Sequence, residues 1–170
     1  MNRFQGPVLN FIYRMLGDRA ESEDLAQEVF VAVFKKIDSF RGDSSLSTWV
    51  FRIASNTCKN RKKYFGRRKH DRVAQKEQLE SVASDTELIT TSSRISRPDE
   101  MVEGLQTERM IQKAIGDLEE NHRMILVLRD IQNMSYDDIS VITGLPLGTV
   151  KSRLHRARMC LKEQLASSLR

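Results

Sequence analysis

The sequence has few of the residues that bind metals, form disulfides or carry out catalysis. Its two cysteines, Cys58 and Cys160, are far apart, and no Cys-x-x-Cys pair or Cys/His cluster with metal-ligand spacing occurs. We therefore expect two reduced thiols, with neither a metal site nor a structural disulfide. The three histidines, His70, His122 and His155, lie in separate segments.

Signatures of enzymes and membrane proteins are also missing. The sequence contains no glycine-rich phosphate loop, no nucleophile elbow and no His-Glu-x-x-His motif. We therefore expect neither an enzyme nor a cofactor. No apolar run reaches the roughly 18 residues that indicate a membrane span, and no signal peptide opens the chain. A cytoplasmic protein with no direct membrane insertion is expected.

Aromatic residues and charges are unevenly distributed, which indicates two domains. All aromatic residues except Tyr136 lie in the first 65 residues. The net charge of +5 divides into +7 for residues 1–70 (14 Lys and Arg, 7 Asp and Glu), −4 for 71–104 (4 and 8) and +2 for 105–170 (10 and 8). Residues 71–97 are rich in Ser and Thr, which favours a flexible acidic linker between domains at 1–70 and 98–170. The basic balance favours a polyanionic partner.

Apolar residues recur with helical spacing in both domains, so the expected fold class is all-α. A stripe spaced by four residues runs from Leu25 to Ile37 and predicts a buried helix face. Pro7 limits how early the first helix begins, and Ser47 or Thr48 is expected to cap the third. Helices are predicted at Phe4–Leu16, Ala20–Ile37, from the Ser47 or Thr48 cap to about Phe65, from Pro98 to about Leu118, and at Asn121–Ile131.

The stretch Ser135–Arg158 has the pattern of a helix-turn-helix. Ser135 can cap the first helix, with Asp138 at capping-box spacing. Gly144 permits a positive φ in the turn, and Pro146 suits the first position of the next helix. That helix is expected to reach about Leu165, with Leu147, Val150, Leu154 and Ala157 inward and Lys151, Ser152, His155, Arg156 and Arg158 outward. A basic outer face on the second helix is typical of proteins that read a DNA major groove.

The third predicted helix of the first domain has a polar face at helical spacing, formed by Arg52, Asn56, Lys59, Asn60 and Lys63. Asparagine is a poor helix former, but its amide can read base edges while neighbouring cations neutralise phosphates. This composition favours nucleic-acid recognition. A solvated lysine-rich surface is the competing interpretation.

The segments EDLAQEVFVAVFKKIDSFRGDSSLSTWVFRIASNTCKNRKK (Glu23–Lys63) and LEENHRMILVLRDIQNMSYDDISVITGLPLGTVKSRLHRAR (Leu118–Arg158) resemble the second and fourth conserved regions of the ECF (extracytoplasmic function) group of bacterial RNA polymerase sigma factors. The two regions have the family's order and separation. The resemblance implies a three-helix region 2-like domain and a region 4-like helix-turn-helix domain. It also implies a transcription initiation factor that binds core RNA polymerase, directs it to promoters and aids promoter melting.

The resemblance implies roles for individual residues. Against the β′ clamp of the polymerase it places Asp24, Gln27 and Glu28, although acidic residues there also suit the helix dipole. At the −10 element it places Ser44, Ser45, Leu46, Ser47, Arg52, Asn56, Lys59, Asn60 and Lys63. At the −35 element it places Arg129, Lys151, Ser152, His155 and Arg156. Docking of the second domain on the β flap and an anti-sigma factor that restrains the protein are further implied partners.

A flexible linker could span two promoter elements only when it is stretched. About 30 flexible residues have an r.m.s. reach near 30 Å, and fully extended they reach roughly 100 Å. Elements about two turns of DNA apart are separated by about 70 Å. We therefore expect the polymerase to hold the linker extended and so to set the spacing.

Two other functions are compatible with the residues. One is a stand-alone helix-turn-helix regulator whose first domain senses a ligand or partner. The basic, asparagine-bearing face of that domain and its lack of pocket chemistry argue against this interpretation. The other is a polymerase-binding regulator without promoter choice, for which the basic face of the last helix would be dispensable.

Overall fold

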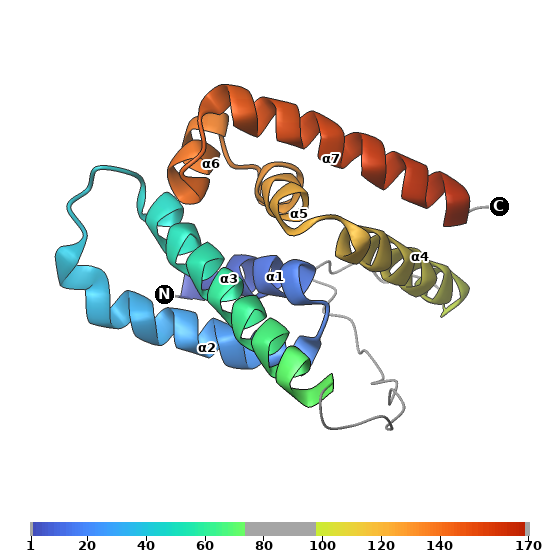
Figure 1. The fold of residues 1–170 in the computed structure, drawn as a ribbon, viewed down its shortest axis with the longest axis horizontal. Helices are drawn as coiled ribbons and strands as arrows, with labels where there is room; N and C mark the ends of the chain where they lie inside the picture. The colour runs from blue at the N-terminus through green and yellow to red at the C-terminus, as the bar shows by residue number, and fades with distance from the viewer. Residues whose placement is uncertain (1, 74–97, 169–170) are drawn as a thin grey trace.

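The structure, a computed structural model, describes residues 2–73 and 98–168, with side chains placed for residues 3–63 and 104–167. Every regular element in these residues is helical, which confirms the all-α class. The first half contains α1 (Asn2–Leu16), α2 (Arg19–Lys36), the 3₁₀ turn η1 (Ile37–Ser39) and α3 (Leu46–Val73). The second half contains α4 (Pro98–Asp117), α5 (Glu120–Leu126), the π-helical turn η2 (Val127–Ile131), α6 (Tyr136–Thr143) and α7 (Leu147–Ser168) (Figure 1).

The first half is built on a core shared by α1, α2 and α3. Phe11 of α1 meets Phe51 of α3 edge to face, with ring centroids 5.6 Å apart. The α2 stripe is buried at Leu25, Val29 and Val33, as its four-residue spacing predicts. Each helix therefore turns an apolar face inward, which leaves the outer faces of α2 and α3 for polar residues.

The second half is organised around α5, whose last residues are buried together with the start of η2. Met124, Ile125, Leu126, Val127 and Leu128 are all at most 2% exposed, so the end of α5 and the start of η2 are buried on every side. The buried side chains of α7 and α6 pack in the same core cluster. An apolar run of this kind needs cover on all sides, and helices of both halves provide it.

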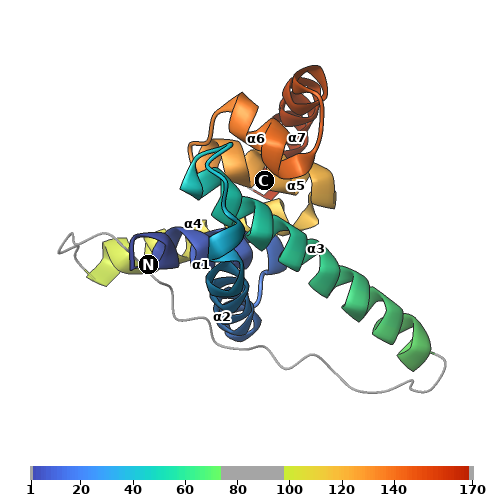
Figure 2. The same cartoon turned by 90° about the vertical axis from the view of Figure 1, so that its left-hand side faces the viewer.

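The two halves pack directly against each other (Figures 1 and 2). α1 contacts α4, α5 and η2, and the start of α3 contacts α6. One hydrophobic cluster includes buried residues of both halves. The two regions predicted from the sequence therefore meet in a close interface. Residues 71–73 continue α3, and the rest of the predicted linker, 74–97, lies outside the described residues.

A single buried arginine joins the two halves at this interface. Arg123 of α5 is 8% exposed and donates from Nη1 to the Met15 carbonyl at the end of α1, over 2.7 Å. Its Nη2 donates to the Leu118 carbonyl over 2.9 Å and also to the Gly116 carbonyl at the end of α4. The last carbonyls of a helix have no partner within the helix. Arg123 therefore supplies donors to two helix ends from different halves.

Several predicted helix limits are wrong for local reasons. α1 begins at Asn2, and Pro7 lies inside it. Pro7 has no N–H to donate to the carbonyl four residues earlier in the helix. Because Pro7 is exposed, water can reach that carbonyl instead. Ser45, not Ser47 or Thr48, caps α3, because its hydroxyl accepts the Thr48 N–H over 3.1 Å. α3 continues to Val73, beyond the predicted limit near Phe65.

Two residues predicted to face inward are exposed instead. Ile37 is 40% exposed because α2 gives way at that residue to a 3₁₀ turn, whose shorter period rotates it off the buried stripe. Leu147 is 41% exposed at the first residue of α7. Pro146 immediately precedes α7, and its carbonyl accepts the Val150 N–H over 3.0 Å. The predicted helix at Asn121–Ile131 ends in the π-helical turn η2.

Replacing Arg123 by alanine is expected to lower the free energy of unfolding by about 3 kcal/mol, because three carbonyl acceptors lose a buried charged donor. Urea denaturation of the full chain measures the effect. Arg109→Ala, at an exposed position of α4, is the control and should change the free energy by less than about 0.5 kcal/mol. Equal effects of the two substitutions would contradict this role for Arg123.

Candidate nucleic-acid and polymerase interface

The helix α3 presents three different faces to its surroundings. Val50, Phe51, Ala54 and Cys58 are buried in the core. A second face carries Thr48 and Ser55, both fully buried, which contact the second half of the chain. The third face is open to solvent and carries the predicted DNA-binding residues. Arg52, Asn56, Asn60 and Lys63 are exposed there, and Lys59 is half-buried.

The segment before α3 is shaped by hydroxyl groups and one glycine. Gly42 has φ +77°, a left-handed conformation that favours glycine. The Ser45 hydroxyl caps the helix and lies 2.7 Å from the Thr48 hydroxyl. Ser44 and Ser47 are half-buried, and Leu46 is 38% exposed. These residues, expected at the −10 element, therefore surround the helix start at the solvent-facing end of the first half.

Trp49 lies one turn into α3 and packs against the loop. Its ring is half-buried, with its centroid 5.4 Å from that of Phe40. Trp49 packs against the edge of the hydrophobic core. This placement gives Trp49 a packing role, and it makes Trp49 a support for the Ser44–Ser47 segment.

The helix-turn-helix has the predicted local geometry. Ser135 precedes α6, and its hydroxyl accepts the Asp138 N–H over 3.0 Å. Gly144 ends α6 with φ +71°, and its N–H donates to the Ser140 carbonyl over 2.8 Å. The Ser140 hydroxyl donates to the Leu145 carbonyl over 2.6 Å and so ties the turn to α6. These bonds fix the direction in which α7 leaves the turn.

The outer face of α7 carries the residues predicted to meet the −35 element. Val150, Leu154 and Ala157 are buried beneath it, and Lys151, Ser152, His155 and Arg156 are exposed. Arg158, also predicted to point outward, forms an ion pair with Asp130 of η2. Its Nε and Nη2 donate to the two Asp130 oxygens over 2.9 and 2.5 Å, which raises the pKa of Arg158.

Arg129 and Lys151 both lie close to the aromatic ring of Tyr136. The Arg129 guanidinium lies 4.9 Å from the Tyr136 ring centroid, and the Lys151 ammonium lies 5.7 Å from the same centroid. Arg129 also donates to the Met134 carbonyl over 2.7 Å. The aromatic ring attracts both cations and groups them at the start of the helix-turn-helix. Tyr136 is a contributor that the periodicity of the sequence did not reveal.

The predicted polymerase-binding residues lie on the outer face of α2. Asp24, Gln27 and Glu28 are exposed, and Glu28 forms an ion pair with Arg61 of α3. The same helix face continues into Val31, 53% exposed, and Phe34, 71% exposed. The sequence analysis missed this apolar extension, although the spacing from Gln27 to Val31 to Phe34 places the three residues on one face.

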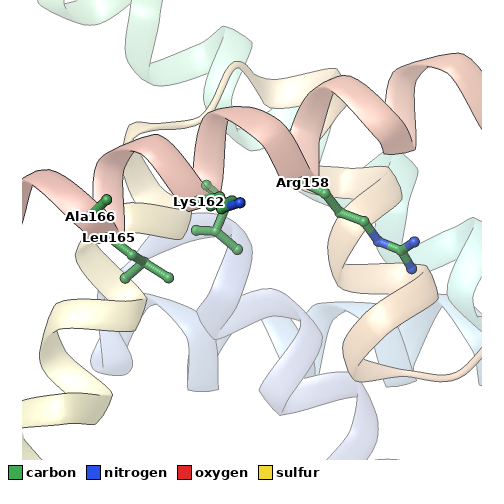
Figure 3. Close-up of a pocket in the computed structure, with 5 residues that line it drawn as sticks. Arg158, Lys162, Leu165 and Ala166 are labelled. Atoms are coloured by element: carbon green, nitrogen blue, oxygen red, sulfur yellow. The ribbon is translucent and has the colours of Figure 1, made fainter.

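The remaining chemistry of the described residues is sparse. Burial raises the pKa of the Cys58 thiol to about 12, whereas Cys160 is exposed. No group of three or more metal-ligating side chains occurs in the described part of the chain. None of its helices combines the length and apolarity of a membrane span. A hollow of about 410 Å³ beside α7 is lined by Arg158, Leu161, Lys162, Leu165 and Ala166 (Figure 3), which include no nucleophile or general base suited to catalysis.

Both halves match the sequence patterns of one family. Residues 1–69 match Sigma-70 region 2, and residues 108–161 match Sigma-70 region 4. The chain therefore belongs to the sigma-70 family of transcription initiation factors. It is 35% identical over 168 residues to RNA polymerase sigma-H factor of Pseudomonas aeruginosa, covering 99% of this chain and 85% of the relative. ECF RNA polymerase sigma factor SigW of Bacillus subtilis is 35% identical over 166 residues (95% and 84%). ECF RNA polymerase sigma-E factor of Escherichia coli K12 is 32% identical over 168 residues (99% and 85%).

Two solved structures of protein complexes contain a chain with the same fold. The sigma factor RpoE from Bartonella quintana, in complex with the anti-sigma factor NepR, has a TM-score of 0.74 and 26% identity, covering 95% of this chain and 91% of that chain. CnrH in complex with the cytosolic domain of CnrY has a TM-score of 0.64 and 23% identity, covering 98% and 84%. The relatives named as ECF sigma factors place the chain in the ECF group that was expected from its residues.

Replacing Gly144 by alanine is expected to lower the free energy of unfolding by about 1–2 kcal/mol. No atom lies within 4 Å of the added Cβ, so the cost comes from the left-handed backbone alone. Gly104→Ala within α4, which also meets no atom, is the control and should raise the free energy by about 0.5–1 kcal/mol. Urea denaturation distinguishes the two. A stabilising Gly144→Ala would show that the turn does not require this conformation.

Proposed function

We propose that the chain reads a promoter at two points while it is bound to core RNA polymerase. In this proposal the exposed face of α3 and the Ser44–Ser47 segment contact the −10 element and help hold it open. The Arg129, Lys151, Ser152, His155 and Arg156 group contacts the −35 element. Asp24, Gln27 and Glu28 bind the β′ clamp, and the second half docks on the β flap.

One observation supports this proposal more than any other. A single chain carries an amide-bearing basic face on α3 and a basic helix-turn-helix face on α7, both open to solvent. Each face lies in a segment that matches a different sigma-70 region, in the family's order. A stand-alone regulator would need only the helix-turn-helix. The match over almost the whole chain to ECF sigma factors favours the two-point reader over that alternative.

Two kinds of side chain, cationic and amide, have different roles in this proposal. Lysine and arginine neutralise phosphates and supply affinity that depends on salt. Asn56 and Asn60 can accept and donate at base edges and so supply sequence preference. Flipping a base costs a few kcal/mol, which a small domain meets more readily when the polymerase contributes to opening. The exposed start of α3 offers hydroxyls and backbone groups where such a base would lie.

The proposal carries expectations about location and regulation. Because it works on RNA polymerase, we expect the protein in the cytoplasm and without enzymatic activity of its own. An anti-sigma factor is the expected restraining partner, by analogy with the complex of RpoE and NepR. The apolar face at Val31 and Phe34 continues the acidic polymerase-binding stretch, and we assign it to the same contact.

Run-off transcription with purified core polymerase and a promoter library tests the function. Promoter-specific RNA should appear only when the chain is added. Asp24→Arg is expected to prevent this by weakening polymerase binding, and it is preferred over a change at Glu28, whose ion pair with Arg61 contributes to the first half. The same transcripts with and without the chain would contradict the proposal.

Replacing Asn56 by alanine should reduce −10 discrimination by about 1–3 kcal/mol, the value of one good base contact. Polymerase binding should survive, because the clamp-binding residues lie on α2. Permanganate footprinting of open complexes on −10 variants measures the change. Asn10→Ala, an identical substitution at an exposed position of α1, provides the control. Unaltered −10 preference in the Asn56 variant would remove this residue from the reading surface.

A further inference from the structure

Leu147, the first residue of α7, is a large apolar residue that the hydrophobic core does not bury. It is 41% exposed. Leu145, two residues earlier in the turn, packs against the core, and Val150 and Leu154 of α7 are buried within it. Leu147 lies outside this cluster of the described residues. The interior of the helix-turn-helix is therefore filled without the Leu147 side chain.

The position of Leu147 distinguishes it from the other exposed apolar residues of the helix-turn-helix. Exposure alone carries no argument, because single apolar residues are common on protein surfaces. Val141 is exposed on α6, and the first helix of such a motif crosses the DNA backbone. Met159 is exposed on α7, but about 18 Å further along the helix than Leu147. Base edges are contacted by the N-terminal residues of the second helix, where Leu147 lies.

Leu147 shares one side of α7 with two residues predicted to meet the −35 element. Lys151 and His155 follow it at intervals of four residues, which places the three side chains on the same side of the helix. Both Lys151 and His155 are exposed. A Cβ added at Gly148 would meet no atom within 4 Å, so the space beside Leu147 is open. The Leu147 side chain therefore extends the exposed face of α7 by one turn toward the helix start.

The predicted −35 contacts lack an apolar group. All five residues in that set are polar or charged, namely Arg129, Lys151, Ser152, His155 and Arg156. Such side chains hydrogen-bond to base edges and phosphates. The major-groove edge of thymine also carries a C5 methyl group, which only an apolar side chain can favour. Leucine has no donor or acceptor in its side chain, so it can favour this methyl by excluding water from it.

We propose that Leu147 contacts the C5 methyl group of a thymine in the −35 element and so favours a T·A pair at that position. The inference rests on the proposed function, because it requires α7 to enter the major groove of the −35 duplex. One turn of an α-helix rises about 5.4 Å, whereas base pairs of duplex DNA are about 3.4 Å apart. A contact one turn before Lys151 therefore falls on a different base pair from the Lys151 contact.

The methyl contact differs from the contacts of the cations in its dependence on salt. Lysine and arginine release counterions from DNA phosphates, so the affinity that they supply falls as the salt concentration rises. An apolar contact neutralises no phosphate. Leu147 therefore contributes a preference for thymine that persists at salt concentrations where the cations contribute less to affinity.

Replacement of thymine by uracil tests the contact, because it removes the C5 methyl group and keeps every hydrogen-bonding group of the base. Promoter duplexes bound by the full chain with core polymerase carry deoxyuridine at each −35 thymine in turn, on either strand. With the unaltered chain, one such replacement should weaken binding about fourfold, the value of one methyl-sized apolar group. With Leu147→Ala the same replacement should leave binding unchanged. Competition with unmodified duplex measures each affinity.

Two further variants separate the contact from general effects on the fold. Leu147→Met keeps an apolar side chain of similar volume and should keep the response to the same deoxyuridine. Val141→Ala shortens an exposed apolar side chain of α6 and should leave the affinity and the response unchanged. The affinity of Leu147→Ala should keep the salt dependence of the unaltered chain, because no phosphate contact is lost.

Two results would overturn the inference. In the first, no replacement of a −35 thymine weakens binding by the unaltered chain. In the second, Leu147→Ala responds to the deoxyuridine as strongly as the unaltered chain does. Promoter-specific complexes would still form in either case. Failure of the proposed function differs, because the unaltered chain would then form no promoter-specific complex with polymerase on any duplex, and the inference would fall with it.

Discussion

The arrangement of the chain depends on the buried guanidinium of Arg123. It binds carbonyls at the ends of α1 and α4 while its own helix, α5, lies in the core. Burial lowers the pKa of Arg123, and the carboxylates of Glu120 and Asp117 act in the opposite direction. A planar group with five N–H donors suits several carbonyls at once. The ends of α1 and α4 are thereby held at fixed positions against α5.

The helix α3 contributes both to the proposed DNA-reading surface and to the contact between the two halves. Its solvent face carries Asn56 and Asn60 among cations, while Thr48 and Ser55 face the second half. The α6 helix has a similar double role, because Asp138 caps its own first turn and accepts a bond from Thr48. Hydrogen bonds from Ser135 and Thr48 lower the pKa of Asp138, so the carboxylate is present as the charged acceptor that this junction needs.

Much of the candidate site could be predicted because it follows local rules. The Ser135 cap, the positive φ of Gly144 and the exposed face of α3 each depend on residues within about one or two helical turns. The Ser45 cap was missed because Ser44, Ser45, Ser47 and Thr48 are similar candidates, and only packing selects among them. The role of each predicted residue toward DNA or polymerase remains a prediction.

The contact between the halves could not be predicted from periodicity. Thr48 and Asp138 are 90 residues apart, and Met15 and Arg123 are 108 apart. In a helical pattern Ser55 and Thr48 look like ordinary surface residues, because no apolar side chain marks the face that they bury. Arg123 likewise reads as a solvated cation. Only tertiary structure shows that these polar residues have partners.

The hydrogen-bonded caps of α3 and α6 have a consequence for how the sequence can change during evolution. A substitution at Thr48 or Asp138 alters a helix start and the contact between the halves at the same time. Selection on either property therefore acts on both positions, although each lies in a different sigma-70 region. Regions that could otherwise be exchanged between relatives as independent modules therefore become tied to each other.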